Sequence, residues 1–197
     1  MSHELKIRPL AADVDDLRGV LALFTGQATQ VDAAGAALLA SLQAGGKLLT
    51  CGNGGSAADA LHLAEELVGR YCRERPALPA ICLAADPTAL TCIGNDYGYE
   101  QVFARGVEAL GRPGDVLIGF TTSGNSPNVL AAFASAKRKG IITVLMSGRD
   151  GGKARGLCDH EIIVPSTTTA RIQEVHTFVL HHWLEAIDAH AWPTQCP

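Results

Sequence analysis

The chain has 197 residues, of which 47% are hydrophobic and 18% charged, and its formal net charge is −4. This length and this share of apolar residues predict one folded domain with a sizeable core, and they exclude an intrinsically disordered chain. Lysine and arginine form no cluster along the sequence, which argues against nucleic-acid binding through a basic face.

Membrane insertion and export are not expected either. No apolar run approaches membrane-spanning length. The opening residues MSHELKIRPLAADVDDL carry acids where a secretory signal needs an apolar core. The six cysteines lack the spacing of a metal site, and Cys51, Cys82 and Cys92 lie in or beside apolar runs. We therefore expect free thiols in a cytoplasmic protein.

Residues 1–45 form a separate N-terminal segment with two predicted helices. The first is ADVDDLRGVLALF, with Asp13 or Asp15 near its start, and the second is VDAAGAALLASLQ. The second is almost wholly small or apolar, and a helix that is apolar all round needs burial on several sides. This pattern predicts contact with a partner subunit as well as with the rest of the chain.

Residues 46–197 alternate short apolar runs with helical stretches. The runs are KLLTC, PAICLA, DVLIGF, ITVLM and EIIVP, and they do not alternate with polar residues. This is typical of strands buried on both faces of a parallel sheet. Helices are expected over residues 57–69, 100–110, 127–139 and about 170–189. The alternation predicts right-handed crossovers and a doubly wound α/β fold.

Two of the strand–helix units resemble each other, in LLTCGNGGSAADALHLAEEL and VLIGFTTSGNSPNVLAAFASA. Each turn opens at the carboxyl end of a parallel strand, where open α/β sheets bind ligands. In the first turn, Asn53–Ser56 allows a ligand to approach the backbone closely. It matches neither a Walker A loop nor a dinucleotide fingerprint. A tight turn without a ligand remains the alternative.

The second turn carries four hydroxyls around one glycine, from Thr121, Thr122, Ser123 and Ser126, and Pro127 opens the next helix. Hydroxyls and a helix N-terminus without a cation suit a phosphate monoester, whose oxygens accept several hydrogen bonds. The alternative is a capped loop in which Ser126 is only the N-cap.

Titratable residues follow on two helices. His62 and Glu66 are four residues apart and share a helix face, whereas we expect Glu65 to point off that face. Near the C-terminus, Gln173 and His181 lie roughly 80° apart around the helix and can reach one cleft. A solvated pair, or histidines that only pack, are the alternatives.

Two further features of this region stay open. His176 competes with His181 for the same helix face, and His182 lies nearly opposite Gln173. The stretch GNDYG, Gly94–Gly98, is expected to be a polar turn that either reaches the ligand or is a simple loop.

Taken together, these motifs resemble the sugar isomerase (SIS) domain family and, within it, the bacterial phosphoheptose isomerases. The resemblance extends from about residue 30 onward and rests on CGNGGSAADALHLAEELVGRY, RPALPA, IGNDYG, GDVLIGFTTSGNSPNV, DGGKA and RIQEVHTFVLHH. It implies a three-layer α/β/α sandwich with a five-stranded parallel sheet of flavodoxin type, preceded by N-terminal helices. It also implies a homotetramer, and several members of the family bind zinc.

The resemblance also implies roles for individual residues. Glu66 and His181 would be the proton-transfer pair, and both would join His62 and Gln173 as ligands of a divalent metal ion, most simply one Zn²⁺ per subunit. The expected substrate contacts are Asn53, Gly54, Gly55, Glu66, Asn95, Asp96, Thr121, Thr122, Ser123, Ser126 and Gln173. Thr121 departs from the serine common in relatives but keeps the hydroxyl.

The implied reaction converts D-sedoheptulose 7-phosphate to D-glycero-D-manno-heptose 7-phosphate, for activated heptose and surface polysaccharide such as lipopolysaccharide. A carboxylate base and a histidine suit the proton transfers of such an aldose–ketose isomerase. Two alternatives remain. One is a non-catalytic relative similar to the replication-initiator-associating protein, and the other is a sugar-phosphate-sensing module.

Overall fold

The computed structural model describes residues 7–192 and has one sheet of five parallel strands at its centre. The strands are β1 (Leu48–Gly52), β2 (Ala80–Cys82), β3 (Val116–Phe120), β4 (Ile142–Gly148) and β5 (His160–Val164). Their order is β2-β1-β3-β4-β5, and each pair is parallel. This is the flavodoxin-like order of a doubly wound sheet, so the predicted fold class is confirmed.

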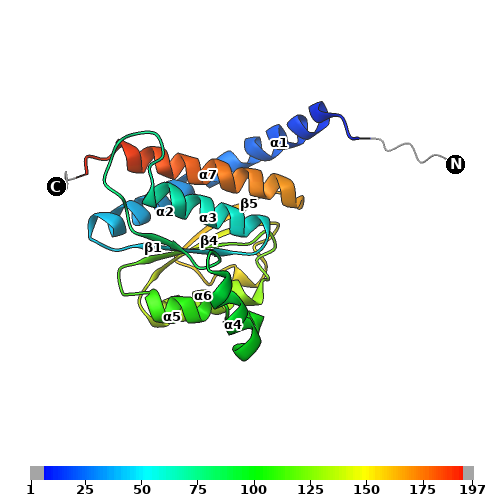
Figure 1. The fold of residues 1–197 in the computed structure, drawn as a ribbon. Helices are drawn as coiled ribbons and strands as arrows, with labels where there is room; N and C mark the ends of the chain where they lie inside the picture. The colour runs from blue at the N-terminus through cyan, green and yellow to red at the C-terminus, as the bar shows by residue number, and fades with distance from the viewer. Residues whose placement is uncertain (1–6, 193–197) are drawn as a thin grey trace.

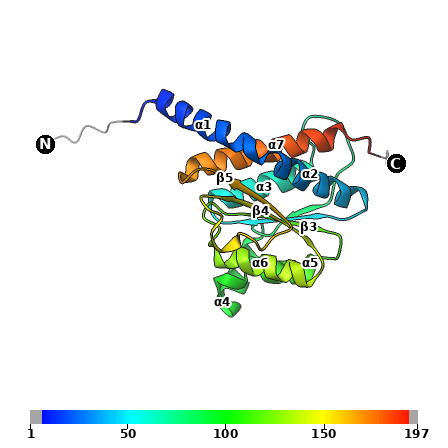
Figure 2. The ribbon, with the colours of Figure 1, turned by 180° about the vertical axis from the view of Figure 1, so that it is seen from behind.

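Helices cover both faces of this sheet. They are α1 (Leu10–Phe24), α2 (Ala28–Gln43), α3 (Gly55–Val68), α4 (Pro87–Tyr97), α5 (Ala104–Leu110), α6 (Pro127–Arg138) and α7 (Thr169–Ala189). Figure 1 shows α2, α3 and α7 on one side of the sheet and α4, α5 and α6 on the other. Figure 2 shows the same layers from behind, with α1 extending past the body of the molecule.

Each face of the sheet has its own apolar core. Side chains alternate along a strand, so on β3 Ile118 enters the core under α2, α3 and α7, and Leu117 enters the core under α5 and α6. Trp183 of α7 is 2% exposed and donates from Nε1 to the carbonyl of Val31 at 2.9 Å. The indole therefore ties α2 to the main core.

The prediction of a polar turn at Gly94–Gly98 is wrong, because every residue of this stretch except Gly98 belongs to α4. The Asp86 carboxylate accepts from the backbone N–H groups of Thr88 and Ala89, and Pro87 occupies the first helical turn. An acidic N-cap followed by proline is a strong helix start. Gly98, with φ of 86°, ends the helix. The helix expected over residues 100–110 is divided into a 3₁₀ turn, Tyr99–Gln101, and α5, which begins at Ala104.

Within residues 7–192, no helix is both long enough and apolar enough to cross a membrane. The cysteines at positions 51, 72, 82, 92 and 158 are free thiols.

One histidine lies entirely inside the fold. His176 of α7 is fully buried, its Nε2 lies 3.2 Å from the carbonyl oxygen of Ser147, and its ring meets that of Phe120 edge-on. It therefore faces the sheet and does not compete with His181. Burial lowers the pKa of His176 to about 4.

This burial predicts a pH effect on stability. The pKa of His176 in the folded protein lies below the usual value of about 6.5. Above about pH 6.5 the neutral ring therefore makes its full contribution to the free energy of unfolding. The contribution is lost as the pH falls toward 4. We expect the free energy of unfolding of His176→Gln to vary less than that of the wild type between these two pH values. Urea titrations measure this, with His190→Gln as the control. Equal pH slopes for wild type and His176→Gln would contradict it.

Candidate functional site

A polar pocket of about 270 Å³ lies at the carboxyl ends of β1 and β3. It is lined by Asn53, Gly55, Ser56, Phe120, Thr121, Thr122, Ser123, Ser126, Thr169 and Gln173. None of these side chains is charged. The pocket joins both predicted turns to the start of α7. Ser56 lies in the first predicted turn but was not an expected contact, and Phe120 and Thr169 were not expected at the site.

Three helices begin at this pocket. The first residue of α3 is Gly55, that of α6 is Pro127 next to Ser126, and that of α7 is Thr169. Each helix N-terminus carries unpaired N–H groups and a partial positive charge. Their convergence favours an anion in a pocket without lysine or arginine.

The hydroxyl-bearing residues of the second turn line the pocket. The Oγ1 of Thr121 and the Oγ of Ser126 lie 3.2 Å apart, and Thr121 also accepts from the N–H of Gly124. Ser126 occupies the N-cap position of α6, yet its side chain makes no capping hydrogen bond. The capping alternative is therefore not what the structure shows, and the Ser126 hydroxyl faces the pocket.

The DGGKA motif, residues 150–154, packs against this turn. Gly124 has a φ of 67° and leaves no room for a Cβ beside the carbonyl of Gly151. The N–H of Ala154 donates to the carbonyl of Gly124 at 3.0 Å, and the N–H of Lys153 donates to Oδ1 of Asn125 at 3.0 Å. The 3₁₀ turn Gly152–Ala154 thus holds the hydroxyl-rich loop in place.

In the first turn, two glycines have different roles. Gly54 has a φ of 56°, which a residue with a Cβ rarely adopts. At Gly55 a Cβ would overlap the carboxamide of Gln173. The absence of a side chain at Gly55 therefore lets Gln173 reach the pocket from α7.

Asn53 connects the two turns. Its Nδ2 donates to Oδ1 of Asn128 at 2.9 Å, and its Oδ1 accepts from Nδ2 of Asn128 at 2.8 Å. The hydroxyl of Tyr99 also donates to Oδ1 of Asn53, at 3.0 Å. Sequence reasoning missed Asn128 and Tyr99, because their partner lies far away along the chain. The second asparagine of GNSPN, directly after Pro127, was the available signal.

The titratable side chains of His62, Glu66 and His181 form a cluster farther along α3. Nε2 of His62 is 3.4 Å from Oε1 of Glu66, and their side chains are 33% and 18% exposed. The ring of His181 meets that of His62 edge-on, with centroids 5.1 Å apart. The expectation that Glu65 points away is wrong. Donor atoms of His62, Glu65 and Glu66 all lie within 4.8 Å of one another, because Glu65 is three residues after His62 and neighbours it on the helix.

The remaining predicted residues are more dispersed. Gln173 lies against Gly55, and Gly55 precedes His62 by seven residues, a rise of about 10 Å along α3. Asn95 and Asp96 are exposed near the end of α4, where Nδ2 of Asn95 donates to Oδ1 of Asp96. His62, Glu66 and His181 therefore lie together within a single chain, and Gln173 lies in the polar pocket next to them.

Comparison with known proteins places the chain among close relatives. A family model described as SIS domain matches residues 14–148. The chain is 50% identical to the phosphoheptose isomerase of Solidesulfovibrio magneticus over 186 aligned residues. The alignment covers 94% of this chain and 91% of the relative. It is 55% identical over 159 residues to the phosphoheptose isomerase of Campylobacter jejuni, covering 81% and 86%. The solved phosphoheptose isomerase of Neisseria gonorrhoeae matches with a TM-score of 0.87 at 40% identity, covering 92% and 97%.

The pocket predicts that its hydroxyls bind phosphate. Ser123→Ala and Ser126→Ala each remove a hydrogen bond to a charged group, which costs on the order of 1.5–3 kcal/mol of binding free energy. We expect inorganic phosphate to raise the melting temperature of the wild type and to lose most of this effect in both variants. Thr91→Ala is the control, because the exposed Thr91 hydroxyl bonds the carbonyls of Pro87 and Thr88 within α4. Equal protection of all four proteins would mean that phosphate binds elsewhere.

Proposed function

This chain belongs to the SIS domain family, and on that premise we propose that it converts sedoheptulose 7-phosphate to D-glycero-D-manno-heptose 7-phosphate. It is a sugar-phosphate isomerase of the aldose–ketose type, supported by relatives of that name at 50% and 55% identity. The observation that carries the proposal is the uncharged pocket where three helices begin. The product would supply activated heptose for surface polysaccharide.

The alternatives have less support. A non-catalytic relative should lack the acid at position 66 or the hydroxyl-rich loop, and this chain keeps both. The sugar isomerase domain of a Sphaerobacter thermophilus transcription factor shares the fold at 19% identity. Such a likeness concerns the fold alone.

The phosphate group supplies binding energy away from the reacting carbons. In the proposed complex, the hydroxyls of Thr121, Ser123 and Ser126 and the three helix N-termini hold the phosphate on C7. Binding energy from this remote group positions C1 and C2 for proton transfer. The uncharged lining suits a substrate that brings its own negative charge.

Proton transfer needs a base and a shuttle. We assign the base to Glu66, whose carboxylate would remove a proton from C1 of the ketose and deliver one to C2 through an enediolate. We assign the shuttle to His181, which would move a proton from O1 to O2. A positioned acid or base of this kind contributes about 10²–10⁴ in rate.

The same cluster suits a divalent metal ion. Two histidines and a carboxylate are typical zinc ligands, and the donor atoms of His62 and Glu66 already lie 3.4 Å apart. We propose that His62, Glu66 and His181 would hold the ion; Gln173, the fourth ligand expected from the sequence, lies about two helical turns away beside Gly55. A bound Zn²⁺ would act as a Lewis acid that stabilises negative charge on the sugar oxygens.

Glu66→Gln tests the base directly. The amide keeps the size of the side chain but cannot take a proton from carbon, so we expect turnover of sedoheptulose 7-phosphate to fall by at least about 10²-fold. Glu65→Gln is the matched comparison, since Glu65 is the more exposed of the two, and it should lose much less. Circular dichroism checks that both variants fold. If Glu66→Gln kept more than about a tenth of wild-type kcat, Glu66 would not be the base.

Metal dependence is a separate prediction. Elemental analysis of protein purified without chelator should find zinc, and removing the zinc should lower both kcat and the melting temperature. His62→Gln should lose the metal but retain phosphate binding, because His62 lies outside the polar pocket. A metal-free wild type that gains neither activity nor stability from added zinc would exclude the metal site.

We also propose that the chain forms a homotetramer. An apolar groove of about 390 Å³ lies between α1, α2 and α7, lined by Leu21, Phe24, Thr25, Ala28, Val31, Asp32, Phe178, Val179 and His182. Phe178 in this lining is 57% exposed, and Leu23 of α1 is 68% exposed. Apolar surface of this kind needs a partner.

Light scattering should therefore give four times the 20.6 kDa mass of the chain. Leu23→Asp should shift the mass downward, because it puts a charge on the apolar surface. A wild type that is monomeric at micromolar concentration would contradict the proposal.

The free thiols at Cys51 and Cys82 support a reducing compartment, and we propose the cytoplasm.

A further inference from the structure

The segment of residues 69–79, between α3 and β2, is fastened to α7 by a buried ion pair. Nε of Arg75 donates to Oδ1 of Asp188 at 2.9 Å, and the two side chains are 2% and 3% exposed. Figure 1 shows this loop passing beside the C-terminal half of α7. An ion pair removed from water persists only with good geometry and further hydrogen bonds, and both partners have them.

Arg75 caps the end of α3. Its Nη2 donates to the carbonyl of Glu66 at 2.5 Å, and its Nη1 donates to the carbonyl of Leu67 at 2.9 Å. The last carbonyls of a helix have no partner within the helix and attract a positive charge. The guanidinium therefore holds the turn of α3 that carries the proposed base.

Asp188 holds the start of the loop. Its Oδ2 accepts from the backbone N–H groups of Cys72 at 2.7 Å and Arg73 at 2.8 Å. Burial alone would raise the pKa of Asp188, but these two hydrogen bonds and Arg75 lower it below the usual value. The carboxylate thus stays charged, and it fixes the backbone directly after Tyr71.

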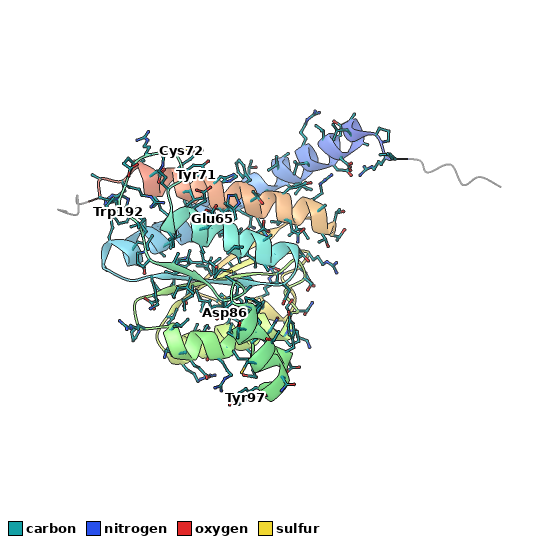
Figure 3. The ribbon with its side chains drawn as sticks, viewed as in Figure 1. Glu65, Tyr71, Cys72, Asp86, Tyr97 and Trp192 are labelled. Atoms are coloured by element: carbon teal, nitrogen blue, oxygen red, sulfur yellow. The ribbon has the colours of Figure 1, made fainter. Side chains whose placement is uncertain are left out.

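Tyr71 lies over the proposed proton shuttle. Its ring stacks on that of His181, with centroids 5.6 Å apart and planes inclined by 24°. Figure 3 labels Tyr71 and Cys72 beside α7, above Glu65 of α3. His181 and Asp188 are seven residues apart, which is close to two full turns, so both face the loop.

His181 is therefore held between two rings, Tyr71 against its face and His62 against its edge. Within the described residues, the contacts found for the imidazole are these aromatic ones. Given the role of His181 in the proposed function, we infer that Tyr71 is a positioning residue that sets the plane of His181, and that the Arg75–Asp188 pair holds Tyr71 in place.

Kinetics on sedoheptulose 7-phosphate test this role. A misplaced catalytic group costs up to about 10²-fold, so we expect Tyr71→Leu to lower kcat by about 10- to 100-fold with KM nearly unchanged. Tyr71→Phe keeps the ring and should restore kcat to nearly the wild-type value. Glu74→Gln is the matched control, because it is an exposed side chain in the same loop. A Tyr71→Leu variant with wild-type kcat would overturn the inference.

A second readout is independent of activity. In the protein as purified, with ¹³C-labelled histidine, the stacked tyrosine should shift the His181 ring protons upfield, and His181→Gln assigns those signals. We expect the shift to vanish in Tyr71→Leu, to persist in Tyr71→Phe and to shrink in Asp188→Asn. Unchanged His181 signals in Tyr71→Leu would overturn the positioning role. A wild type without isomerase activity would instead overturn the proposed function, while the spectra would still report the stacking.

Discussion

The pairing of β1 with β3 is the contact on which the polar pocket depends. These strands are separated in the chain by β2 and the three α-helices α3, α4 and α5, yet they lie side by side with Leu48 opposite Val116 and Gly52 opposite Phe120. Because both strands end at the same edge, the turns at Asn53 and Thr121 face each other. The paired amides of Asn53 and Asn128 then join them.

A second constraint is the packing of α3 beside α7. Their contacts follow in order along both helices: Gly55 with Gln173, Asp59 with Thr177, and His62 with His181. Such an order means that the two helices run parallel, with both N-termini at the pocket. The polar pocket and the cluster of His62, Glu66 and His181 therefore lie at successive positions along one helix pair.

Close backbone approach and burial explain why particular residue types are required at some positions. Gly55 makes room for Gln173, and Gly124 makes room for the backbone of Gly151. Arg75 and Asp188 are buried charges whose bonds all serve the loop and the end of α3. Removing both charges from water costs free energy, and the hydrogen bonds that surround this pair offset that cost.

The sequence by itself determined the local pieces: the five strands, most of the helices between them, the glycine-rich and hydroxyl-rich turns and the shared face of His62 and Glu66. These follow from periodicity and from contacts within about four residues. Its errors were local too, since Asp86 and Pro87 start a helix that includes most of Gly94–Gly98, and Glu65 reaches His62. Only the tertiary structure decided which strands are neighbours, that Asn53 meets Asn128, and that Tyr71 covers His181. Those contacts join residues far apart in the chain, and their geometry depends on how the layers pack rather than on any spacing along the sequence.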